Sequence, residues 1–147
     1  MSLSKTVAGK VGQTLAELGA RQCFGVIGTA NFKVTHALIN SGVRYVPARH
    51  EGNAATMADA YAKATGELTL LSVHSGPGLT NALTGIGEAA KSRTPLLVLA
   101  GDAPVGGVTS NFYFDQGAMA QSVGAVAERV HSAHTALNDT VRAVTRA

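Results

Sequence analysis

The sequence has a single cysteine and no long apolar run. Cys23 lies in a short apolar run beside Phe24, which excludes an internal disulfide and a cysteine-rich zinc site and predicts a buried core thiol. No apolar run approaches the roughly 20 residues that span a bilayer, and the N-terminus lacks the apolar region of a signal peptide. We therefore expect a cytoplasmic protein with no membrane partner.

Charge is also scarce. Only 14% of the 147 residues are charged, against 46% that are hydrophobic, and the net charge of +3 comes from scattered Lys and Arg. Without a basic run, nucleic acid is not an expected partner. A chain of this size predicts one domain, residues 1–147. Its sparsely charged exterior predicts that a second domain or subunit covers part of it.

Helical and strand-like patterns alternate along the chain. Helices are expected at residues 6–18, 32–39, 53–64 and 79–90, and strands at 23–27, 43–47, 68–73 and 96–100. After a loop at 106–116, we expect a short helix at 118–123, a last strand at 127–130, and a closing helix at 135–146 with Val141 and Val144 inward. Such alternation predicts an α/β fold, a doubly wound parallel sheet with helices on both faces.

Ligands of such sheets bind beyond the carboxyl ends of the strands, and the glycine-rich or charged positions lie there: Gly28, Glu51, and residues 75–78 and 101–104. The dinucleotide pattern GxGxxG is absent, and no lysine follows the glycines as in a P-loop. A flavodoxin-like mononucleotide protein would need a phosphate loop after the first strand, and residues 28–31 make a poor one. Nucleotide binding is therefore disfavoured.

Glu51 stands where a strand that we expect to be buried meets the start of a helix, and the small residues Gly52, Ala54 and Ala55 follow it. These small side chains let another surface approach closely. A glutamate in a first helical turn also has a simpler explanation, because it interacts favourably with the helix dipole. Position alone leaves both explanations open.

The residues around Glu51 carry a family resemblance. Residues 49–62, which begin Arg-His-Glu-Gly-Asn, closely resemble the RHE segment of thiamine diphosphate enzymes of the acetolactate synthase and 2-keto acid decarboxylase superfamily. Thr65-Gly66, residues 75–81 (Ser-Gly-Pro-Gly-Leu-Thr-Asn) and residues 101–104 (Gly-Asp-Ala-Pro) recur in the family's order and approximate spacing. The resemblance is to the N-terminal pyrimidine-binding (PYR) domain of these enzymes and covers residues 6–146. The sequence departs from the family at Ile27, where many relatives carry proline.

The resemblance implies thiamine diphosphate as cofactor and a 2-keto acid as substrate. It makes Glu51 the carboxylate that hydrogen-bonds to the aminopyrimidine and activates the cofactor, and a low-polarity setting would help this carboxyl group to share a proton with the ring. Gly28, Gly76, Pro77 and Asn81 are the other cofactor-binding residues implied. Residues 75–81 and 91–95 favour an acetolactate synthase-like reaction, but carboligation and decarboxylation both stay open.

His74 and the aromatic loop at residues 112–116 each have two possible interpretations. His74 is a candidate for proton transfer or a hydrogen-bonded structural histidine, whereas His50 is expected only to position the glutamate loop. Phe112, Phe114 and Gln116 resemble a loop that lines the pocket of a neighbouring subunit in synthases, and they also fit a hydrophobic anchor for a long loop.

The family's diphosphate and Mg²⁺ motif, GDG followed by asparagine, is absent, so we expect no metal ligand in this chain. The resemblance places Mg²⁺ on a second (PP) domain of another subunit and implies a homodimer or tetramer. The alanine-rich helix after Glu51 is a candidate for the contact between subunits. FAD as a second cofactor stays open. The chain is expected to be a fragment of a longer enzyme, with the small subunit of a two-chain 2-keto acid decarboxylase or a non-catalytic dimerisation or interaction domain as alternatives.

Overall fold

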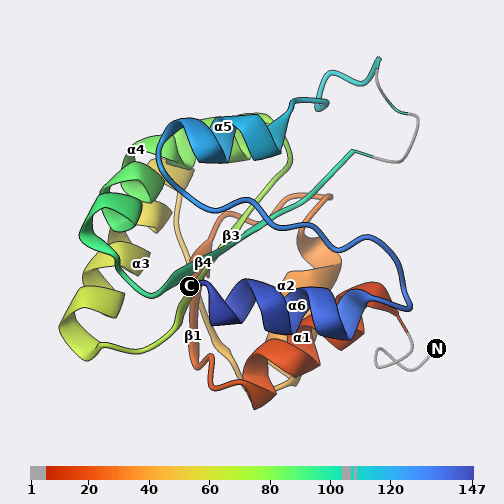
Figure 1. Ribbon diagram of the computed structural model, residues 1–147, viewed down its shortest axis with the longest axis horizontal. Helices are drawn as coiled ribbons and strands as arrows, with labels where there is room; N and C mark the ends of the chain where they lie inside the picture. Colours follow the sequence, from red (N-terminus) through yellow and green to blue (C-terminus); the bar gives the residue numbers. More distant parts are fainter. Residues whose placement is uncertain (1–5, 104–106, 108) are drawn as a thin grey trace.

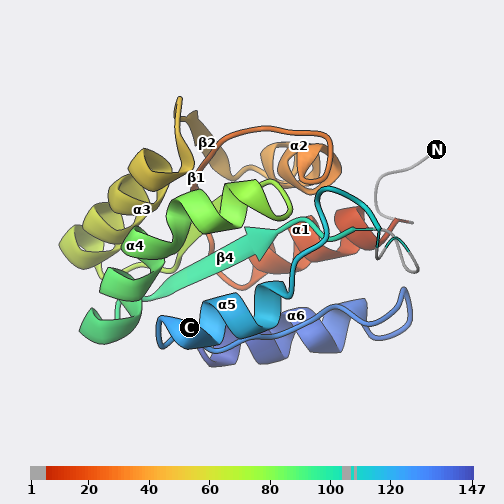
Figure 2. The ribbon, with the colours of Figure 1, turned by 90° about the horizontal axis from the view of Figure 1, so that it is seen from above.

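A computed structural model describes residues 6–103, 107 and 109–147. Its four strands form one parallel sheet in the order β2-β1-β3-β4, and Figures 1 and 2 show the helices around it. The elements are α1 (Val7–Glu17), β1 (Gln22–Gly25), α2 (Phe32–Asn40), β2 (Arg44–Pro47), α3 (Glu51–Thr65), β3 (Thr69–Val73), α4 (Pro77–Ser92), β4 (Leu96–Ala100), α5 (Gln116–Ser122) and α6 (Ala136–Thr145). The predicted α/β architecture with a parallel sheet is confirmed.

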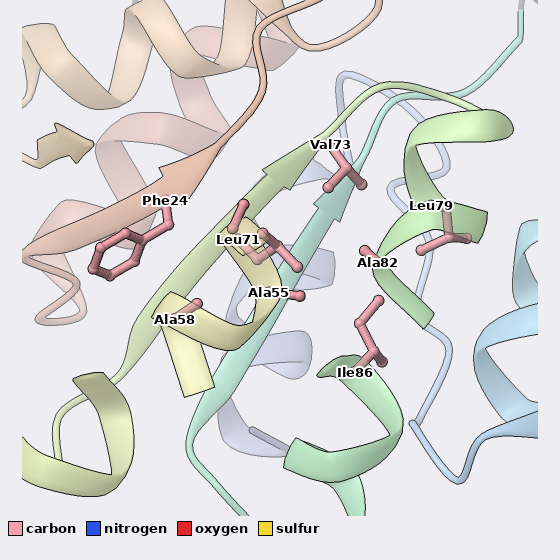
Figure 3. Packing of buried hydrophobic residues seen from close by; sticks show 9 residues of the cluster. Phe24, Ala55, Ala58, Leu71, Val73, Leu79, Ala82 and Ile86 are labelled. Carbon is pink, nitrogen blue, oxygen red and sulfur yellow. The ribbon is translucent and has the colours of Figure 1, made fainter. Parts of the chain in front are cut away.

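Alternating side chains of the central strands build one core on each face of the sheet. Leu71 and Val73 of β3 pack with α3 and α4 (Figure 3), whereas Leu70, between them in the chain, packs with α1 and α2. Every residue of β3 is buried, because successive side chains of a strand point to opposite faces and both faces are covered. Helices therefore cover both faces of the sheet, as predicted, and a hydrophobic cluster lies on each face.

Helices α3 and α4 pack unusually closely through small residues. Ala54, Ala55 and Ala58 are fully buried, and a Cβ on Gly85 of α4 would lie 2.6 Å from the Cβ of Ala55. The alanine face that we assigned to a subunit contact is therefore used within the chain. A subunit contact through α3 would need its other face.

Three helices begin two residues before the expected positions: α3, α4 and α5, the last of which starts at Gln116 rather than at residue 118. Helix α3 begins at Glu51 rather than at residue 53, because the Nδ1 atom of His50 accepts a hydrogen bond from the Gly52 N–H at 3.1 Å and caps the first turn. Helix α4 begins at Pro77, a residue suited to the first helical turn. The strand before Glu51 is also less buried than expected, since β2 is an edge strand with exposed ends.

The predicted last strand at residues 127–130 is wrong. This segment has no regular structure, and it lies across a groove of about 1020 Å³ from the residues of β4. Among the described residues, no strand pairs with the outer edge of β4. A strand needs a neighbour for its backbone hydrogen bonds, so the apolar pattern of residues 127–130 is not sufficient. Val141 is also 38% exposed rather than inward, whereas Val144 packs on the core.

Asp139 ties the segment before α6 to that helix. Its carboxylate accepts hydrogen bonds from the His131 backbone N–H at 2.9 Å and from Arg142 at 2.9 Å. The His131 N–H, followed by the Thr135 side chain, lowers the pKa of Asp139 from 3.8 to about 2. Because the folded-state pKa lies below the unfolded one, this stabilisation is present above about pH 4 and is lost as the pH falls towards 2.

We therefore expect Asp139→Asn to remove part of the acid sensitivity of the fold. Urea unfolding of both proteins between pH 2 and 6 measures this. The stability difference between wild type and variant should shrink as the pH falls from about 4 to 2. If this difference in the free energy of unfolding stayed constant with pH, Asp139 would not be a source of the acid sensitivity of the fold.

Candidate functional site

The carboxyl ends of the parallel strands bring the predicted site residues to one edge of the sheet. Gly28 follows β1, Glu51 follows β2, His74 follows β3 and Gly101 follows β4. Contacts between the loops confirm their proximity. A Cβ on Gly28 would lie 2.3 Å from the His74 ring, and a Cβ on Gly101 would lie 2.5 Å from that of Ala30. None of the helices in the described part of the chain is long and apolar enough to cross a membrane.

Glu51 is held by the start of helix α4. Its Oε2 atom accepts a hydrogen bond from the Asn81 side-chain amide at 3.0 Å. Its other oxygen, Oε1, lies 3.3 Å from the position of a Cβ on Gly78. The carboxylate is half-buried at the first turn of α3, so the helix dipole also favours its charge. One oxygen is thus fixed by Asn81, and the described residues give the other no hydrogen bond.

His74 shares Gly78 as a neighbour with Glu51, since a Cβ on Gly78 would lie 3.1 Å from the His74 Cβ and 3.3 Å from Glu51 Oε1. Its Nε2 atom lies 3.2 Å from the Thr29 hydroxyl, and its Nδ1 atom lies 3.0 Å from the Ser75 carbonyl oxygen. Phe112 meets the imidazole edge-on, with ring centroids 5.0 Å apart. Only a glycine at position 28 leaves room for this ring, so packing against His74 requires glycine there whether or not a cofactor binds.

The loop after β4 covers the Gly76-Pro77 turn. Gly76 has a φ of +63°, a conformation that favours glycine, and a Cβ there would lie 2.6 Å from the Phe114 ring. The Gly76 N–H donates to Gln116 Oε1 at 3.0 Å, and Gln116 Nε2 donates to the Gly101 carbonyl at 2.7 Å. These contacts favour the anchor reading of the aromatic loop over a contribution to a neighbouring subunit.

Asn31 is a buried residue that sequence reasoning missed. Its Oδ1 atom accepts from the Gly28 N–H at 2.7 Å, and its Nδ2 atom donates to the Val26 carbonyl and to Ser72 Oγ, both at 3.0 Å. The side chain is fully buried and clamps the loop after β1 onto β3. The signal available was an asparagine just before a helix, a common capping position.

Other polar and ionisable groups have structural roles. Burial raises the pKa of the Cys23 thiol to about 12, so this cysteine is an unreactive core residue as expected. Asp102 at the end of β4 pairs with Arg129. Within residues 6–103, 107 and 109–147, no group of three or more His, Cys, Asp or Glu side chains is placed to hold a metal ion.

Comparison with known proteins agrees with this arrangement. Residues 5–128 match the family model described as thiamine pyrophosphate enzyme, N-terminal TPP binding domain. The chain is 42% identical over 104 residues to the acetolactate synthase large subunit of Lactococcus lactis, covering 69% of this chain and 18% of the relative. It is 44% identical over 90 residues to the acetolactate synthase isozyme 3 large subunit of Escherichia coli, covering 60% and 16%.

A third relative has a different reaction. The chain is 41% identical over 85 residues to a probable 2-ketoarginine decarboxylase of Pseudomonas aeruginosa, covering 58% of this chain and 15% of the relative. The chain therefore spans less than a fifth of the length of each of these curated relatives. Because the family model matches most of the sequence, this chain belongs to the family of thiamine pyrophosphate enzyme N-terminal TPP binding domains.

Proposed function

We propose that this chain supplies the pyrimidine-binding half of a thiamine diphosphate site in a longer enzyme that acts on 2-keto acids, and that Glu51 activates the cofactor. The observation that carries the proposal is the Glu51 carboxylate, which stands at the carboxyl edge of the sheet with Oε2 held by Asn81. Its Oε1 atom is left to accept a hydrogen bond from a ring nitrogen. Family membership supports the choice of cofactor.

The residues present fit the aminopyrimidine end of this cofactor. A carboxylate fixed by one hydrogen bond can share a proton with a ring nitrogen through its second oxygen. When bound, thiamine diphosphate supplies a carbon nucleophile and an electron sink for the 2-keto acid. Gly28, Gly76 and Pro77 shape the turns around Glu51, and we propose that they and Asn81 line the cofactor's position.

Glu51 is only half-buried in this chain, so the proposed site needs a cover. A covering domain would exclude water and strengthen the hydrogen bond made by the carboxylate. We propose that the cover is the PP domain of a second subunit, which would hold the diphosphate and Mg²⁺, so that the enzyme is a homodimer or tetramer.

We propose that the full polypeptide catalyses an acetolactate synthase-like reaction. The relatives include acetolactate synthases and a probable 2-ketoarginine decarboxylase, so carboligation and decarboxylation are the two outcomes to be distinguished. Product analysis after incubation with pyruvate distinguishes them. Carboligation gives acetolactate, whereas simple decarboxylation gives acetaldehyde.

Calorimetric titration of thiamine diphosphate with Mg²⁺ tests the division into two domains. We expect the longer polypeptide that contains this chain to bind the cofactor, and the 147-residue chain alone to bind it at least tenfold more weakly, because it lacks the groups proposed to hold the diphosphate. A longer polypeptide that binds no cofactor would contradict the proposal. It would leave a non-catalytic interaction domain in which Glu51 stabilises the start of α3.

A further inference from the structure

The Thr29–His74 contact joins two loops at the point where the sheet changes its direction of winding. From β1 the chain proceeds to β2 on one side, and it then returns to β3 on the other side. Thr29 lies in the loop after β1 and His74 in the loop after β3, and their side chains meet at 3.2 Å. Ligands of doubly wound sheets bind at such a switch point. The contact therefore lies where a ligand is expected.

The surroundings of His74 select one neutral form of its ring. The Ser75 carbonyl oxygen, 3.0 Å from Nδ1, can only accept a hydrogen bond, so Nδ1 must carry the hydrogen. The Ser75 hydroxyl, 3.2 Å from the same nitrogen, can accept from it as well. In a neutral imidazole the other nitrogen, Nε2, then has a free lone pair. The atom that accepts a proton is consequently Nε2.

Thr29 is the residue that faces this lone pair. A threonine hydroxyl donates one hydrogen bond and accepts others, so Thr29 can donate to Nε2 while the ring is neutral. When Nε2 takes up a proton, the hydroxyl can turn and accept from the new N–H. The hydrogen bond thus survives both protonation states, and Nδ1 continues to donate to Ser75.

We infer that Thr29 is a positioning residue for proton transfer by His74: its hydroxyl bonds Nε2, the basic atom of an imidazole whose Nδ1 hydrogen is held by the Ser75 carbonyl. The inference rests on the proposed function, because a positioned proton acceptor matters only in a site that carries out proton transfer. The ring is fixed on its other sides by Gly28 and Phe112. Thr29 is exposed, so its replacement should leave the core unchanged.

Nitrogen-15 NMR of the histidine ring in the 147-residue chain tests the inference without cofactor. Two-bond proton-nitrogen correlations are recorded at about pH 8, above the ordinary range of histidine titration. The His74 signals are assigned by their loss in His74→Gln. We expect one tautomer, with the hydrogen on Nδ1, in the wild type. Thr29→Ser, which keeps the hydroxyl, should give the same pattern.

Thr29→Val keeps the shape of the side chain and removes the hydroxyl. We expect it to keep the hydrogen on Nδ1 and to shift the Nε2 resonance, because the Nε2 lone pair loses its hydrogen bond, while backbone amide shifts away from the site stay unchanged. Thr29→Ala serves as a second variant and should behave in the same way. A wild-type ring with the hydrogen on Nε2, or Thr29→Val spectra identical to wild type, would overturn the inference. Because no cofactor is present, the result is independent of the cofactor titration.

Discussion

Replacing Glu51 with glutamine is expected to reduce 2-keto acid turnover by the complete enzyme by about 10²–10⁴-fold, the usual contribution of a proton-transferring side chain. Glutamine has nearly the same shape and can still accept the Asn81 hydrogen bond seen at 3.0 Å. It cannot take up or share a proton, however. Steady-state turnover of pyruvate at saturating cofactor measures the loss, which should fall on kcat.

Glu67→Gln is the matched control for this substitution. Glu67 is an exposed carboxylate between α3 and β3, at the amino end of β3 and so opposite the carboxyl end where the site lies, and its loss should leave turnover within about twofold. Thermal unfolding of both variants should match the wild type within the small range expected of surface substitutions. Full turnover by the Glu51 variant would reduce this residue to a helix-start carboxylate.

Replacing Asn31 with alanine is expected to destabilise the fold by about 3 kcal/mol, since each unsatisfied buried polar group costs roughly 1–3 kcal/mol. The substitution leaves the Gly28 N–H, the Val26 carbonyl and the Ser72 hydroxyl without their Asn31 partner. Water cannot easily replace it, because the side chain is fully buried. Urea unfolding followed by circular dichroism gives the free energy of unfolding.

Asn40→Ala is the control, because Asn40 is an exposed asparagine at the end of the same helix. Its replacement should change the free energy of unfolding by less than about 0.5 kcal/mol. If Asn31→Ala costs no more than this control, the loop after β1 does not depend on the clamp. A stable variant with an altered His74 ring spectrum would instead limit the role of Asn31 to positioning the Gly28 loop.

The order of the elements up to β4 could be predicted from the sequence because their signals are local. The apolar run at residues 68–73 marks a strand buried on both faces, and that is how β3 is placed. The strand predicted at residues 127–130 failed because strand formation depends on a neighbouring strand, which a local pattern does not specify. The start of α3 was also misplaced by two residues, since the cap made by His50 is a side-chain contact.

The location of the candidate site was predictable, whereas its internal contacts were not. Glu51 follows β2 and His74 follows β3, two strands of one parallel sheet with β1 between them, and the fold class alone brings such positions to one edge. The partners of these residues lie far away in the sequence: Asn81 is 30 residues from Glu51, and Thr29 is 45 residues from His74. Sequence spacing does not specify which side chain meets which across such separations, and Asn31 was missed as a connector for the same reason.

The measurement that tests the central claim most directly is the rate at which the C2 hydrogen of thiamine diphosphate exchanges with deuterium when bound to the complete enzyme. This rate reports cofactor activation without requiring any substrate. The account predicts fast exchange in the wild type and in Glu67→Gln, and a rate about 10²-fold or more lower in Glu51→Gln at equal cofactor occupancy. Equal exchange rates in the wild type and Glu51→Gln would contradict the assignment of Glu51 as the activating carboxylate.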